Sequence, residues 1–124
     1  MRLTPALAIA ALLISTLFAA SAMAECVYPK TPGAAPNGTG ATKEEMLAFK
    51  AVIDTYQSEV NAYLECLDKD ADAKIAEAGD NADTVKQIKQ MRDKKHNAAL
   101  DELTARADEF NQQVRAFNKN KPKS

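Results

Sequence analysis

The sequence lacks an excess of charge of either sign. Among its 124 residues, 16 Lys and Arg stand against 17 Asp and Glu, so the formal net charge is -1. Residues 1–24 hold a single charged side chain, Arg2, and removing them leaves 15 basic against 17 acidic residues, a net of -2. Proteins that bind nucleic acid usually carry a strongly basic surface. The composition therefore gives no reason to predict a nucleic acid as a partner.

The charges are nevertheless sorted into blocks along the chain. Residues 65–83 contain seven acidic and two basic side chains, whereas residues 86–95 contain five basic and one acidic side chain. Such blocks are typical of a solvated helix surface on which neighbouring charges pair. We interpret them in that way and assign them no function.

Motifs for catalysis and for cofactor binding are also missing. There is no glycine-rich phosphate loop, no nucleophile elbow and no cluster of cysteines and histidines that would hold zinc. The Asp68–Asp72 stretch begins like a calcium-binding loop, but that loop needs Gly at its sixth position and Glu at its twelfth. Those positions hold Ala73 and Gly79. We therefore predict no metal, no cofactor and no catalytic residue.

The long apolar run lies near the start of the chain, where residues 1–24 have the features of a secretory signal peptide. Arg2 gives a short positive region, residues 6–20 are apolar apart from two hydroxyl residues, and small residues precede the cleavage site. The pattern predicts cleavage after Ala24. The mature protein is then periplasmic or secreted.

Two other roles of this segment agree less well with its residues. A membrane anchor needs roughly 20 consecutive apolar residues, and this run is shorter and is followed at once by polar sequence. A lipoprotein would be modified at a cysteine such as Cys26, but the residue before that cysteine should be small, and here it is Glu25. We expect no membrane span once the signal is removed.

Two cysteines, Cys26 and Cys66, belong to the part of the chain that we predict to be exported. An even count in an oxidising compartment predicts one disulfide, within the chain unless two molecules pair. Closing a loop of about 41 residues would stabilise the fold by roughly 4 kcal/mol if loss of chain entropy is the mechanism. A redox-active pair is disfavoured because the chain has no C-x-x-C motif.

Residues 25–41 are rich in proline and glycine, which excludes a regular helix or a central strand. We predict an extended arm, because its reach of roughly 50 Å exceeds the length of about 36 Å that the following helix covers up to Cys66. The arm is expected to lie on the flank of that helix that carries Val52 and Cys66. Its expected apolar contacts are Val27 and Tyr28.

The tripeptide Asn37-Gly38-Thr39 within the arm has two interpretations. It matches the acceptor pattern for N-glycosylation. Its Asn-Gly pair is equally typical of a tight turn. The sequence alone does not choose between the two.

The clearest signal of secondary structure is a heptad repeat that begins after residue 42. Its apolar residues are spaced alternately three and four apart, as on the contact face of a coiled-coil helix. Thr42 precedes the repeat as a helix N-cap, and Glu45 stands three residues later, which is the pattern of a capping box. The seven seam residues are Met46, Phe49, Ile53, Tyr56, Val60, Tyr63 and Leu67.

A second long helix is predicted beyond a short break in the chain. Gly79 would cap the first helix, and either Asp80 or Asn81 would start the second. The second helix would end near Asn118, before a basic and disordered tail over residues 119–124. Its apolar or tolerable stripe consists of Val85, Ile88, Ala99, Leu103, Ala107, Phe110, Val114 and Phe117.

Folding the chain at residue 80 brings the two stripes together. Facing residues then have numbers that sum to about 160, so that Phe110 faces Phe49 or Lys50. The predicted fold class is all-α, an antiparallel two-helix hairpin over residues 42–118. The Pro/Gly-rich arm, residues 25–41, is strapped onto it by the disulfide.

The second stripe is interrupted by Arg92 and His96, which occupy positions that should be apolar. The same pairing sets Arg92 opposite Asp68, and it sets His96 near Tyr63. This group could do acid–base chemistry, because histidine exchanges protons near neutral pH. We favour a structural interpretation, in which a hydrated polar layer near the tip of the hairpin fixes the register of the helices.

Three segments carry a resemblance to a known family. They read ECVYP over residues 25–29, AT followed by EEM over residues 41–46, and YLECL over residues 63–67. In these segments the chain resembles an uncharacterised family of small secreted, single-disulfide helical proteins of Proteobacteria. The resemblance spans most of the mature chain and implies export, the disulfide and the helical fold, but no activity.

Two classes of function are consistent with these observations. We favour a non-enzymatic interaction protein, which binds a protein partner or a partly unfolded client through the hairpin. The alternative is a small-molecule binder or a small enzyme centred on Tyr63, Arg92 and His96. Apolar residues outside the seam would also allow a weak homodimer, because exposed apolar patches usually mark interaction sites. These residues are Val52, Leu64, Ile75 and Met91.

The first prediction concerns processing. The mature protein should begin at Glu25 and contain one bridge between Cys26 and Cys66. Intact mass spectrometry of the exported protein, with and without alkylation, measures both properties. A different N-terminus or two alkylated thiols would contradict the prediction.

Overall fold

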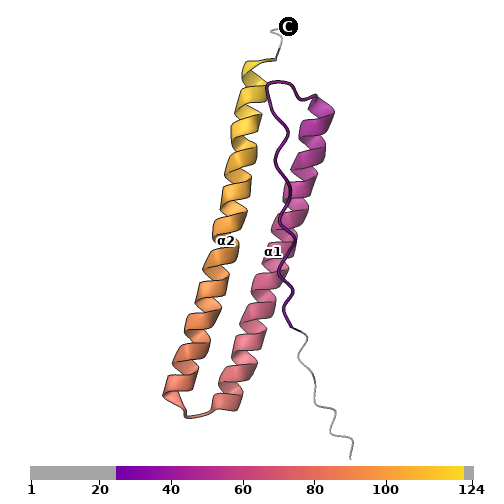
Figure 1. Ribbon diagram of the computed structural model, residues 1–124. Coiled ribbons are helices and arrows are strands. Elements are labelled where there is room, and N and C mark those ends of the chain that lie inside the picture. Colours follow the sequence, from indigo (N-terminus) through magenta and orange to yellow (C-terminus); the bar gives the residue numbers. More distant parts are fainter. Residues whose placement is uncertain (1–24, 122–124) are drawn as a thin grey trace, which may run out of the picture.

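The computed structural model describes residues 25–121, and within that range it contains two long helices and no strand. Helix α1 spans Lys43–Ala78 and helix α2 spans Ala82–Lys119. The two helices lie side by side in antiparallel directions (Figure 1). The predicted all-α hairpin is confirmed, whereas the predicted signal peptide, residues 1–24, lies outside the described residues. Neither α1 nor α2 has a stretch long and apolar enough to cross a lipid bilayer.

Helix α1 begins with the predicted capping box. The backbone N–H of Glu45 donates to Oγ1 of Thr42 at 3.2 Å, and the backbone N–H of Thr42 donates to Oε2 of Glu45 at 2.8 Å. Two backbone donors that the first turn would leave unpaired are thereby satisfied. Two acidic residues in that turn, Glu44 and Glu45, also interact favourably with the positive end of the helix dipole.

The turn between the helices begins at Gly79, whose φ of 55° is in the region that favours glycine. Its backbone N–H donates to the carbonyl oxygen of Ile75 at 3.2 Å. Asn81 is the N-cap of α2, since its Oδ1 accepts from the backbone N–H of Thr84 at 3.1 Å. The open choice between Asp80 and Asn81 is thus decided, and α2 ends at Lys119, one residue beyond the predicted end.

The core follows the predicted heptad seam along α1. All seven seam residues are buried except Phe49, which is half-buried and lies with its ring centroid 5.4 Å from that of Phe110. Two clusters result, one near the middle of the hairpin around Val60 and Ala99, and one near its open end around Phe110. The predicted pairing of the helices is therefore confirmed. The buried apolar residues are Met46, Ile53, Tyr56, Val60, Tyr63, Leu67, Ala71, Ala99 and Phe110.

The disulfide between Cys26 and Cys66 is present, with the two Cα atoms 5.7 Å apart. From this bridge the arm runs as an extended chain along the helices towards the start of α1 (Figure 1). The ring of Tyr28 meets that of Tyr63 edge-on, with 5.1 Å between centroids. Partial burial raises the pKa of the Tyr28 phenol, and the nearby Tyr56 and Glu102 raise it further. Since Glu102 belongs to α2, the arm is close to both helices.

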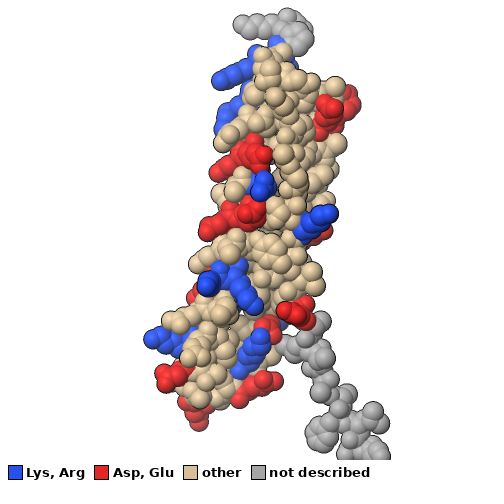
Figure 2. Space-filling view, in the orientation of Figure 1, with Lys and Arg blue, Asp and Glu red and all other residues tan. Residues whose placement is uncertain are grey.

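The expected position of the arm needs a correction. It does not stay on the flank of α1, because Ala35 packs against the cluster that contains Phe110 of α2. Val27 is not an apolar contact, since it is 83% exposed, and Val52 remains 45% exposed beside the arm. Pro29 is buried instead. The arm therefore lies in the groove between the helices, where it forms a largely uncharged strip (Figure 2).

The arm turns at Asn37 before it enters α1. Oδ1 of Asn37 accepts from the backbone N–H of Thr39 at 3.0 Å, and its carbonyl oxygen accepts from Gly40 at 3.1 Å and from Ala41 at 2.9 Å. These bonds account for the Asn-Gly pair as a turn. No described feature bears on glycosylation.

Gly38 in this turn makes a close backbone contact with α2. Its backbone N–H donates to Oε1 of Gln113 at 2.9 Å, although the two residues are 75 positions apart. A Cβ atom at Gly38 would overlap the carbonyl group of Gln113 and would lie 2.8 Å from the backbone nitrogen of Phe117. The missing side chain thus lets the arm backbone rest directly on the helix backbone.

We predict that Gly38→Ala destabilises the protein by about 1 to 3 kcal/mol or more, because an added methyl group cannot fit without displacing backbone. Gly33→Ala is the matched control, since nothing lies within 4 Å of a Cβ atom at that position. Urea unfolding of the disulfide-intact proteins measures both changes. Equal stability of the two variants would show that the contact between the arm and α2 is loose.

Candidate functional site

The structure brings together three of the four residues of the predicted polar layer. Nε2 of His96 lies 3.4 Å from Oδ1 of Asp68, and Nε of Arg92 lies 3.9 Å from the same oxygen. The closest partner of Arg92 is Asp93, with 2.8 Å between Nη2 and Oδ1. One carboxylate on α1 therefore faces two basic side chains of α2. The pairing of the helices predicted the approach of Arg92 to Asp68 but not that of His96.

The fourth residue, Tyr63, does not join this group. It is buried in the central cluster, and its ring contacts Tyr28 of the arm. Among the described residues no hydrogen bond links Tyr63 to Asp68, Arg92 or His96. The layer consequently lacks the phenol that the acid–base hypothesis assigned to it.

The electrostatics of the layer are those of a partly hydrated surface. The pKa of the Arg92 guanidinium is raised chiefly by its hydrogen bond to Asp93, and attraction to Asp93 and Asp68 adds to the effect. Exposed ion pairs of this kind contribute little to stability. Nε2 of His96 is buried but has no hydrogen bond of good geometry among the described residues. The arrangement is compatible with the register role that we favour.

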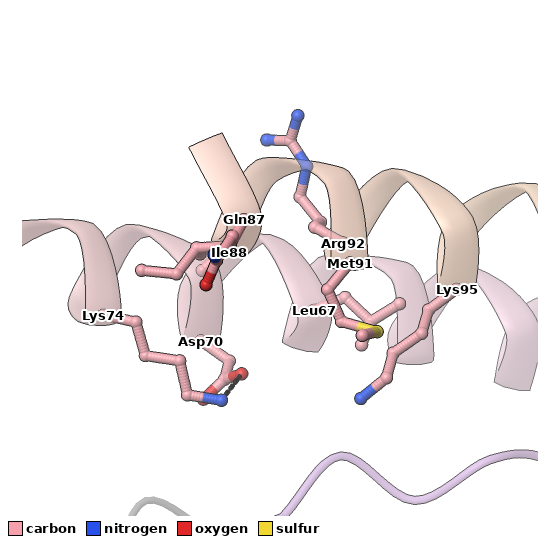
Figure 3. Close-up of a pocket in the computed structure, with 9 residues that line it drawn as sticks. Leu67, Asp70, Lys74, Gln87, Ile88, Met91, Arg92 and Lys95 are labelled. Carbon is pink, nitrogen blue, oxygen red and sulfur yellow. Dashed lines mark hydrogen bonds and ion pairs between the residues drawn. The ribbon is translucent and has the colours of Figure 1, made fainter. Parts of the chain in front are cut away.

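A second site lies next to the start of the arm, and we call it the distal groove. It is a cavity of about 270 Å³ between α1 and α2, on the side of the tip (Figure 3). The arm starts beside Cys66, so none of the described residues 25–121 lies over the groove between the helices from Leu67 towards the turn. The residues that line it are Leu67, Asp70, Ala71, Lys74, Gln87, Ile88, Met91, Arg92 and Lys95.

The distal groove has an apolar floor and charged edges. Leu67 and Ala71 are buried at its base, and Met91 at its edge is 54% exposed. Nζ of Lys74 lies 2.7 Å from Oδ2 of Asp70, so these two charges are paired. Lys95 has no ion pair among the described residues. The site is therefore suited to an apolar group with polar neighbours.

Sequence reasoning found this site only in part. Met91 was expected to lie outside the seam and is exposed, as is Val52, whereas Leu64 and Ile75 are half-buried. Exposed Leu47 and Leu100 were missed. The available signal for the groove was the position of Cys66, because a bridge there determines where the covered part of the hairpin begins.

Metal binding has no support in residues 25–121, which contain no group of three or more His, Cys, Asp or Glu side chains able to hold an ion. No family model, no curated protein and no solved structure matches the chain.

We predict that His96→Leu leaves the fold intact, because it removes a buried nitrogen that lacks a hydrogen bond. The free energy of unfolding should stay within about 0.5 kcal/mol or increase. Leu103→Ala should instead cost about 2 kcal/mol, since Leu103 is half-buried against the central cluster. Urea unfolding compares the two variants. Unfolding of the His96 variant with a silent Leu103 variant would contradict the assignment of the seam between the helices.

Proposed function

We propose that this chain is a non-enzymatic interaction protein, periplasmic or secreted, which binds an extended segment of a partner protein in the distal groove. The observation that carries the proposal is the arm itself. An extended segment already occupies the adjoining part of the same groove, where it contacts both helices. The distal groove continues that path and is not covered by any described part of the arm.

The chemistry of the arm supports a particular kind of segment as the occupant of the groove. Tyr28 places a ring against the core, and Ala35 packs as a small apolar residue. Gly38 adds a hydrogen bond from its backbone. A partner segment that alternates apolar side chains with accessible backbone would make contacts of the same types. Recognition of extended peptides by grooves between structural elements is a common mode of protein interaction.

The location outside the cytoplasm is supported by the disulfide. Bridges of this kind persist in oxidising compartments and are rare where thiols are kept reduced. The signal pattern in residues 1–24 points to the same location. An unfolded client presents extended segments too, so the client-binding form of the hypothesis uses the same groove.

The proposal can be tested by site-specific photo-crosslinking in cells that normally express the protein. A benzophenone amino acid at Met91 should form an adduct with a protein partner, because this side chain borders the groove. The matched control is the same substitution at Asp101, which is exposed on α2 outside the groove lining. Mass spectrometry of the adduct should map the crosslink to an extended segment of one partner.

Two results would contradict the proposal. Equal adducts from both positions would indicate unspecific contact. An adduct with the mass of two copies of this chain would instead indicate that the groove is the surface of a homodimer.

A further inference from the structure

We propose that the segment bound in the distal groove presents a carboxylate to Lys95 and an adjacent apolar side chain to Leu67 and Ala71. This inference rests on the proposed function and adds the chemistry of the occupant. It commits to an acidic, extended segment of a protein partner.

The charges along the groove leave one cation unpaired. The lining holds three basic residues and one acidic residue. Lys74 is paired with Asp70, and the guanidinium of Arg92 is bound to Asp93. Figure 3 shows this guanidinium and the ammonium group of Lys95 pointing in opposite directions. Lys95 is thus the cation left for a ligand, and its natural partner is a carboxylate.

The apolar part of the site accepts one or two side chains. Leu67 and Ala71 are buried at the base, while the exposed thioether of Met91 stands at the edge. Flexible methionines adapt to side chains of different shape. The cavity of about 270 Å³ is just below the range of roughly 300 to 1,000 Å³ that is typical of small-molecule sites. A peptide side chain fits this size better than a complete small ligand.

The distal groove also offers a polar side chain that can form a hydrogen bond with the backbone of the segment. In the covered part of the groove, Gln113 of α2 accepts a hydrogen bond from the backbone N–H of Gly38. Gln87 of the same helix lines the distal groove, and the hydrogen bonds among the described residues do not involve its side chain. We assign Gln87 the role that Gln113 has towards the arm. A carboxamide can pair with backbone whatever the sequence of the segment.

A second copy of this chain is a weaker candidate for the occupant. The segment with the right extended form is the arm, and in each copy the disulfide and Gly38 hold the arm in its own groove. Donating the arm to a neighbour would require loss of those contacts. A separate partner requires no such rearrangement.

The test uses the full mature chain with its disulfide intact and three blocked hexapeptides as probes. The first repeats Pro-Leu-Glu, and the second and third carry Gln and Lys in place of Glu. Titrations followed by ¹H–¹⁵N NMR should show shifts at residues 67–74 and 87–95. The Gln peptide should bind about fivefold more weakly than the Glu peptide, which corresponds to about 1 kcal/mol for an exposed ion pair. The Lys peptide should bind more weakly still.

Substitutions then assign the contacts. Lys95→Gln should abolish the preference for the Glu peptide, and Lys95→Glu should reverse it in favour of the Lys peptide. Lys94→Gln is the matched control, because Lys94 is exposed next in sequence but is not part of the groove lining. Gln87→Ala should weaken the Glu and Gln peptides by equal factors. Met91→Gln should weaken all three.

The possible failures can be distinguished. Equal binding of the three peptides in the groove would refute the carboxylate and leave the proposed function intact. Shifts confined to other surfaces, or the absence of shifts, would refute this site for acidic segments, and a crosslink from Met91 would still support partner binding. A preference that survives Lys95→Gln but is lost in Lys94→Gln would place the recognition of charge outside the groove.

Discussion

Two packed helices bury only the line along which they meet, and everything else in this fold depends on how the adjacent groove is covered. Here an extended arm fills it. The arm is anchored at one end by the disulfide to Cys66 and at the other by the contact of Gly38 with α2. Between these points Pro29 becomes buried without needing a backbone donor for a hydrogen bond. The core is thus shared by three segments.

Much of the fold could be predicted because helix geometry is regular. A rise of about 1.5 Å per residue and one defined turn determine to within a residue which positions face each other. Numbering therefore set Phe110 against Phe49 or Lys50, and the structure places its ring against Phe49. The sideways position of the arm could not be derived in this way. Its length permits either flank, and the deciding contact is made by Gly38, whose backbone approach leaves no periodic pattern in the sequence.

Of the two candidate sites, the polar layer could be predicted in part from the helix pattern, whereas the distal groove could not. Interruption of an apolar stripe identified Arg92 and His96, and the pairing placed Asp68 opposite Arg92. The contact of Asp68 with His96 was not predicted. Tyr63 was grouped with these residues because it lies at a similar position along the axis of the hairpin. Its ring, however, contacts that of Tyr28 in the arm. The distal groove is defined by the end of a covering segment. The distal groove could therefore not be located before the position of the arm was known.

The position of the disulfide also makes the two ends of the molecule mechanically unequal. Residues 26–66 form a closed covalent ring, so tension applied at Glu25 passes through the sulfur atoms directly into the middle of α1. The arm and the part of α1 before Cys66 carry none of it. Tension applied beyond Lys119 acts first on α2, whose covalent link to the ring runs only through the turn at Gly79 and the rest of α1. Pulling from that end peels one helix away, turn by turn, while the ring stays closed.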